Sequence, residues 1–197
     1  MALDLAGIPW VFFGTGNKED VKESSNPQEG FYAVKDDGDG NYPRQESDLS
    51  NVTASSKNTF TASLTKGWYL KLLKSGNTLE KLLAKPTVFQ RLVYFTTYLN
   101  PDTTDPCVSG GSGNLYAVEY LSGGGAFGVT ELSQLSGTGG TRYKTVGSEL
   151  PSAPVISINT EGRASVVVGT TLGKYFSQEI LSPPSLKNIL YWREVIP

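Results

Sequence analysis

The chain has 197 residues, 38% of them hydrophobic, and contains three Trp, ten Tyr and eight Phe. This length and composition allow one domain with a real core, and 22 Gly and 11 Pro favour an all-β fold with many turns. The net charge of −2 without a basic block excludes a nucleic-acid interface, and the absence of histidine excludes Ser-His-Asp and Cys-His hydrolases and His-ligated zinc sites.

The N-terminal part of the chain is expected to contain two strands. Residues 8–14 form an almost continuous apolar run that ends in a Gly-Thr-Gly turn, which is typical of a buried strand. Residues 31–35 form the second apolar run. The segment GTGNKED between them lacks the spacing of a phosphate-binding loop, so we interpret it as a turn.

An acidic segment, residues 36–48, follows the second strand and has the oxygen spacing of a calcium-binding loop. With Asp37 as position 1, the candidate Ca2+ ligands at positions 1, 3, 5, 7, 9 and 12 are Asp37, Asp39, Asn41, the carbonyl of Pro43, Gln45 and Asp48. Three features depart from an EF-hand: position 6 is Tyr42 instead of Gly, Asp48 replaces a bidentate Glu, and no helices flank the loop. The alternative interpretation is an acidic, glycine-rich hairpin tip that holds no ion.

The clearest strand signals lie between residues 67 and 124. Residues 68–72, 87–89, 92–99 and 114–120 are rich in aromatic and β-branched side chains. Only Gln90 and Arg91 separate two of these segments, which predicts a tight hairpin, although neither residue is the Gly or Asn that such turns prefer. Residues 100–113 are dense in turn formers and contain the single cysteine, Cys107. This cysteine is either a free thiol or half of a bridge to another chain or to a missing part of the protein.

After residue 125 the sequence alternates between loops and strands. We expect strands at residues 153–158, 164–169 and 187–196, with a hairpin turn at residues 159–162. Residues 126–132 are expected to form a strand or short turn, and residues 143–146 to pair locally. No stretch has the roughly 18–20 apolar residues of a membrane span, and the N-terminus lacks a signal-peptide pattern. The chain is therefore either a cytoplasmic protein or a segment cut from a longer secreted one.

Several sequence blocks together point to a known family. They are PWVFFGTGNKED, EGFYAVKDDGDG, GWYLKL, KPTVFQRLVYFTTYL and DPCVSGGSGNLYAVEYLSGG, in this order between residues 9 and 124. In this order they resemble the C-terminal β-propeller region of the type IV pilus-associated (PilY-type) adhesin family, whose members are carried at or near the pilus tip. The tail after Gly125 matches less distinctly.

The resemblance implies antiparallel sheets that form part of a β-propeller, or a compact β domain derived from one. Roughly ten to twelve expected strands correspond to about three blades of four strands each. Because fewer than about four blades do not close a propeller, residues 1–197 are expected to be a single β domain from the C-terminal part of a larger protein. Such a partial propeller would expose apolar sheet faces and would associate with a partner.

The resemblance also bears on two local segments. Leu79, Leu82 and Leu83 share one face of a helix that Pro86 would end, whereas the family pattern implies a strand at residues 78–84. The family carries D-x-D-x-[DN] calcium loops on a β scaffold, and this pattern extends to Asp37, Asp39 and Asn41. The family's next carboxylate is replaced by Gln45, which would weaken the charge of the site.

The leading functional hypothesis is a non-enzymatic adhesion or pilus-assembly module at the cell surface. It would present the loops at residues 37–48 and 100–113 to a partner, with calcium ordering the acidic loop. The expected partners are pilin or minor pilin subunits, the remainder of the propeller as another chain, or a host or surface receptor. One alternative is a structural subunit of an extracellular filament. A propeller enzyme is disfavoured, because the chain has no histidine and its paired carboxylates sit in polar loops.

Overall fold

The computed structural model confirms the all-β class, with three sheets in which strand pairing is antiparallel except between two strands of the first. It describes residues 1–17, 28–40, 42–53, 66–75, 78–101, 110–136 and 140–181. Helical structure in these segments is limited to two 3-10 turns, η1 (Glu46–Asp48) and η2 (Leu132–Ser136). No helix in the described segments is long and apolar enough to cross a membrane.

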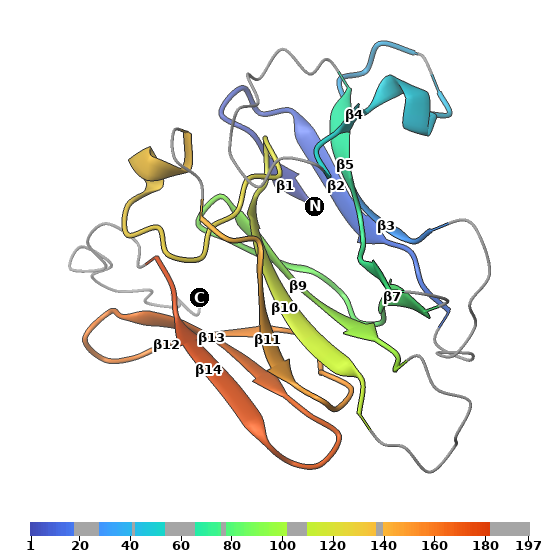
Figure 1. The fold of residues 1–197 in the computed structure, drawn as a ribbon. Helices are drawn as coiled ribbons and strands as arrows, with labels where there is room; N and C mark the ends of the chain where they lie inside the picture. Colours follow the sequence, from blue (N-terminus) through green and yellow to red (C-terminus); the bar gives the residue numbers. More distant parts are fainter. Residues whose placement is uncertain are drawn as a thin grey trace, which may run out of the picture.

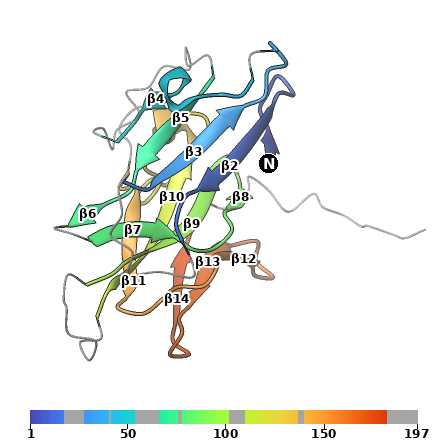
Figure 2. The ribbon, with the colours of Figure 1, turned by 90° about the vertical axis from the view of Figure 1, so that its right-hand side faces the viewer.

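Sheet 1 is built by the N-terminal part of the chain and has five strands in the order β1-β2-β3-β5-β4 (Figure 1). The strands are β1 (Ala2–Leu3), β2 (Pro9–Gly14), β3 (Gly30–Lys35), β4 (Ser50–Asn51) and β5 (Gly67–Lys71). Figure 2 shows β2, β3 and β5 side by side. Because side chains alternate across a strand, Trp10 and Phe12 of β2 are buried on one face, while Val11 and Phe13 are exposed on the other.

Sheet 2 has six strands, in the order β11-β10-β9-β7-β6 with β8 paired to β9. They are β6 (Lys74–Ser75), β7 (Thr78–Leu82), β8 (Thr87–Phe89), β9 (Leu92–Leu99), β10 (Ser112–Glu119) and β11 (Tyr143–Gly147). The predicted hairpin between β8 and β9 is confirmed. Gln90 and Arg91 have φ angles of 52° and 63°, so both adopt the left-handed conformation that a two-residue hairpin turn requires even without glycine.

Sheet 3 contains β12 (Val155–Ile158), β13 (Ala164–Gly169) and β14 (Tyr175–Glu179). The predicted turn at residues 159–162 joins β12 to β13, and the amide of Gly162 donates to the carbonyl of Asn159 at 3.0 Å. Sequence patterns did not predict β14. It carries a single large apolar side chain on its half-buried face, Phe176, so its hydrophobic alternation is weak.

Sheet 2 is the central layer of the molecule and is covered on both faces (Figure 1). On β9, Val93 and Phe95 pack in the core shared with sheet 1, and Leu92 and Tyr94 pack in the core shared with sheet 3. This double burial explains why β9 is apolar on both of its faces. Sheets 1 and 3 therefore each bury one face, and their other faces carry exposed apolar side chains such as Phe13 and Val155.

The structure resolves the ambiguous segment at residues 78–84. The helical interpretation is wrong, because β7 pairs with β9 and tertiary pairing overrides the helix preference of the leucines. The strand expected at residues 187–196 lies outside the described residues, and so do residues 102–109 of the loop at residues 100–113, including Cys107. The described residues form three sheets of five, six and three strands, and membership in a larger propeller stays a prediction.

Candidate functional site

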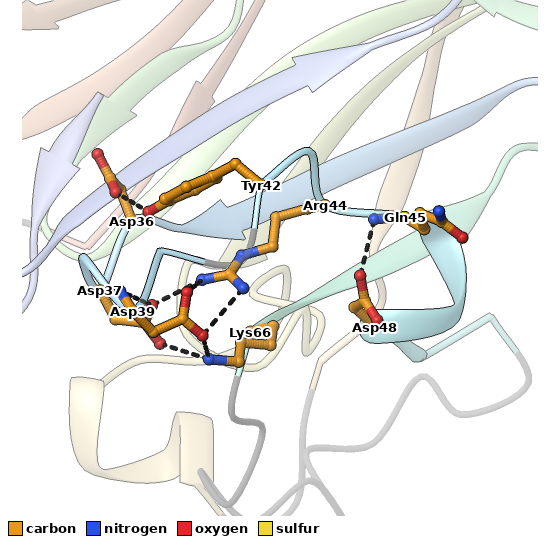
Figure 3. A network of polar contacts seen from close by, with 8 residues as sticks. All are labelled: Asp36, Asp37, Asp39, Tyr42, Arg44, Gln45, Asp48 and Lys66. Carbon is orange, nitrogen blue, oxygen red and sulfur yellow. Dashed lines mark hydrogen bonds and ion pairs between the residues drawn. The ribbon is translucent and has the colours of Figure 1, made fainter.

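The acidic loop, which we define as residues 36–48, leaves the end of β3 and leads into β4 at the edge of sheet 1. Asn41 lies outside the described residues. Figure 3 shows most of the polar side chains of this loop together with Lys66, which directly precedes β5. The amide of Lys35 donates to the carbonyl of Lys66 at 2.9 Å, and this bond holds Lys66 next to the start of the loop.

Asp37 and Asp39 lie close together, as the sequence spacing predicts, and both are paired with cations (Figure 3). Arg44 Nη2 lies 2.6 Å from Asp37 Oδ1 and 2.6 Å from Asp39 Oδ1, and Arg44 Nη1 donates to Asp39 Oδ2 at 3.1 Å. Lys66 Nζ donates to Asp37 Oδ2 at 3.2 Å and also to Asp39 Oδ2. The Arg44 side chain is 6% exposed, whereas those of Asp39 and Lys66 are each 24% exposed, so this cluster is partly shielded from solvent.

The ionic forms of these groups stabilise each other. Desolvation raises the pKa of Asp37, but hydrogen bonds from Lys66 and from the Asp39 amide bring this pKa below its ordinary value of 3.8. The hydrogen bond to Asp39 raises the pKa of Lys66 above 10.5. Asp37 and Lys66 are therefore both charged at neutral pH, and salt weakens such partly exposed pairs.

The other two candidate calcium ligands with described side chains bond to each other. The amide of Gln45 donates to Asp48 Oδ2 at 2.8 Å, and the amide of Asp48 donates to the carbonyl of Gln45 at 3.0 Å, so the two residues cap the turn η1. Pro43 directly precedes Arg44 in the chain. The described ligands do not fit a calcium loop in this arrangement, because Asp37 and Asp39 contact cations while Asp48 caps a turn. Within the described segments, no group of three or more Cys, Asp or Glu side chains could hold a metal ion.

The contact with Lys66 is one anchor of the acidic loop, and a second anchor, at Glu46, attaches η1 to the exposed face of sheet 1. Glu46 Oε2 accepts hydrogen bonds from Lys71 Nζ at 2.7 Å and from the Tyr32 hydroxyl at 2.8 Å. Lys71 Nζ also lies 5.2 Å from the ring centre of Tyr69, within cation–π range. The acidic loop is thus held at Lys66 and at Lys71, which lie at the two ends of β5.

Acid is expected to weaken the second anchor. The hydrogen bonds from Lys71 and Tyr32 lower the pKa of Glu46 below 4.5. A lowered folded-state pKa contributes stability that is present above the unfolded-state pKa and is lost as pH falls through the folded-state value. We expect the Glu46 carboxyl, followed by NMR, to titrate below pH 4.5 and to move back toward 4.5 in Lys71→Met, which keeps the aliphatic stem. A wild-type titration midpoint at or above pH 4.5 would show that Lys71 and Tyr32 do not stabilise the ionised Glu46 carboxyl.

A second polar cluster lies inside sheet 2 and was missed from the sequence. Glu80 on β7 is fully buried and accepts hydrogen bonds from the side chains of Thr97, Asn114 and Tyr116. It also accepts from the amide of Leu73 at 2.8 Å. Because its oxygens are buried and hydrogen-bonded within the protein, Glu80 has a structural role and does not form part of an exposed site.

Arg142 is a further buried charge, beside a cavity of about 570 Å³ between sheets 1 and 2. Burial lowers its pKa to about 10. Its Nε donates to the carbonyl of Gly123 at 2.8 Å, and its Nη1 donates to the carbonyl of Thr53 at 3.3 Å. Arg142 therefore links two segments that are distant in sequence, which is a structural role.

Local spacing could reveal Asp37, Asp39 and Arg44, which lie within one short segment, but not Lys66. Lys66 reaches Asp37 across 29 sequence positions, and Glu80 reaches Tyr116 across 36. The local sequence around Lys66 or Glu80 does not indicate these distant partners.

Comparison with known proteins gives two curated relatives, both described as a type IV pilus biogenesis factor PilY1 homolog, from Xylella fastidiosa. The first is 26% identical over 221 residues, which cover 96% of this chain and 17% of the relative. The second is 31% identical over 107 residues, which cover 51% of this chain and 7% of the relative. The chain thus spans a small part of the length of these relatives, and they confirm the PilY-type resemblance. No family model and no solved structure matches the chain.

Proposed function

We propose that this chain, as a relative of the PilY1-type factors, is a non-enzymatic β-sheet module that acts at the cell surface in a type IV pilus system. The observation that carries the proposal is the similarity to a type IV pilus biogenesis factor PilY1 homolog along 96% of the chain. Its partners would be pilin or minor pilin subunits, other sheets of a larger propeller, or a surface receptor. Adhesion and pilus assembly are the two activities that experiments must distinguish.

The geometry supports a module that presents a loop in a fixed position. The acidic loop is attached to both ends of β5, and sheet 1 rests on the doubly buried sheet 2. A loop that is held in place loses little conformational entropy when it binds a partner. Tyr42 is 51% exposed at the surface of this loop and is a suitable contact residue, because tyrosines are frequent at interface hot spots.

The outer faces of sheets 1 and 3 support association with further protein. Val11 and Phe13 are exposed on sheet 1, and Val155 and Tyr175 are exposed on sheet 3. Apolar side chains gathered on an exposed face favour contact with another protein surface. These faces are where further sheets would pack in the predicted propeller.

In-frame deletion of the region that corresponds to this chain, in a piliated bacterium, would distinguish adhesion from pilus assembly. Surface pili would be counted by electron microscopy, and attachment of cells to a surface would be measured in parallel. Loss of pili would assign the segment to assembly, and normal pili with lost attachment would assign it to adhesion. Normal pili with normal attachment would contradict the proposal.

Replacement of Tyr42 with alanine tests the acidic loop as the contact surface. If the partner is a pilin, we expect binding of the purified chain to purified pili to weaken by about fivefold or more, as for an interface hot spot. Leu172→Ala is the control, since Leu172 is 71% exposed in the turn between β13 and β14 and is not on either of the outer sheet faces described above. Biolayer interferometry would measure both variants, and equal affinities would show that the loop does not contact the pilus.

A further inference from the structure

In the cluster formed by Asp37, Asp39, Arg44 and Lys66, the charges sum to zero without any added ion. Asp37 and Asp39 contribute two negative charges, and Arg44 and Lys66 contribute two positive ones. All four carboxylate oxygens accept a hydrogen bond from one of these cations. Arg44 makes a fork-like contact with both oxygens of Asp39, which is the strongest geometry for such a pair.

A calcium ion at the same carboxylates would meet two obstacles. Oxygen ligands lie about 2.3–2.6 Å from a bound calcium ion. The ion would therefore have to displace the Arg44 and Lys66 nitrogen atoms that now contact the carboxylate oxygens. It would also lie beside Arg44 and Lys66, and like charges repel more strongly where water is partly excluded. The Arg44 side chain is 6% exposed, so salt screens its charge less than it screens a fully exposed one.

The position of Lys66 makes this cluster a link between the loop and the sheet. Lys66 directly precedes β5, and its carbonyl accepts from the amide of Lys35 at the end of β3. The ammonium group therefore extends from a fixed point on sheet 1 to both carboxylates. A metal ion bound only by the loop would not provide this connection.

We propose that Arg44 and Lys66 take the place of a divalent cation in the acidic loop, so that the loop is ordered without calcium. The inference concerns the order of the loop and does not depend on the proposed role in a pilus system. It also assigns a role to Arg44, which lies among the expected calcium ligands without being one of them.

Hydrogen–deuterium exchange of residues 36–48 tests the proposal on the whole chain. The wild type is compared with Arg44→Gln/Lys66→Gln, each in a chelator and at about 1 mM calcium chloride, within the range where extracellular modules bind calcium. The matched control is Lys85→Gln/Arg163→Gln, which removes the same charge from exposed positions. If the double variant does not fold, Lys66→Gln alone replaces it, because the Lys66 side chain is 24% exposed.

The expected result has three parts. Exchange in the wild type and in the control is the same with and without calcium. In the double variant, exchange in the chelator is roughly threefold to tenfold faster, because the carboxylates lose their partners. Calcium then restores slow exchange in the double variant, since the carboxylates become available to it.

Three outcomes would overturn the proposal. Slower exchange of the wild-type loop in calcium would show that the ion binds despite the cations. Exchange in the double variant that matches the control would show that Arg44 and Lys66 do not order the loop. Fast exchange in the double variant that calcium leaves unchanged would show that the two cations do not stand in for a divalent ion.

Discussion

Replacement of Glu80 with alanine is expected to lower the free energy of unfolding by about 3 kcal/mol or more. The substitution leaves the side chains of Thr97, Asn114 and Tyr116 and the amide of Leu73 without their shared acceptor. Each buried donor that loses its partner costs about 1–3 kcal/mol, and the removed side chain also leaves a cavity. Urea unfolding followed by tryptophan fluorescence would measure the loss.

Two further variants separate the stability contributed by the hydrogen bonds of Glu80 from the general effect of removing a carboxylate. Glu179→Ala removes an exposed glutamate from β14 and is expected to change stability by less than about 0.5 kcal/mol. Glu80→Gln keeps the shape of the side chain but turns one acceptor into a donor, so an intermediate loss is expected. A Glu80→Ala protein as stable as Glu179→Ala would show that the hydrogen bonds of Glu80 contribute no net stability.

Hydrophobic alternation predicted the strands that are rich in apolar residues. Residues 8–14, 92–99 and 114–120 pack against other layers, so burial imposes a pattern on the sequence. Alternation gave no signal for β14, because this strand buries little apolar surface. It also allowed a false helical interpretation at β7. In β7 the helical spacing of Leu79, Leu82 and Leu83 was a coincidence that only pairing with β9 could exclude.

The candidate site was predictable only as far as local spacing reaches. The alternation of Asp37 and Asp39 correctly placed two carboxylates together, because residues two apart in a tight loop can face the same point. The structure adds a partner that this spacing could not indicate, Lys66, which directly precedes β5. A long-range partner of this kind leaves no periodic signal, so the loop alone could suggest a calcium site but not the contact with Lys66.

Phe95 is the centre of the contact between sheets 1 and 2, and its replacement with alanine is expected to cost about 3–5 kcal/mol. Its ring is fully buried and is stacked between Phe31, at 3.9 Å and 4°, and Tyr116, at 4.7 Å and 9°. Removal of the ring leaves a cavity bounded by strands of two sheets, and paired strands cannot move together to fill it.

Phe13→Ala is the matched control for this effect. The Phe13 ring is also stacked on an aromatic neighbour, Tyr32, at 5.3 Å, but Phe13 is 44% exposed on the outer face of sheet 1. Its loss is expected to cost about 1 kcal/mol, because little buried volume is emptied. Thermal and urea unfolding of both variants would measure the difference. Equal losses would mean that the interface between sheets 1 and 2 is no better packed than an exposed sheet face, and the acidic loop would then lack a rigid support.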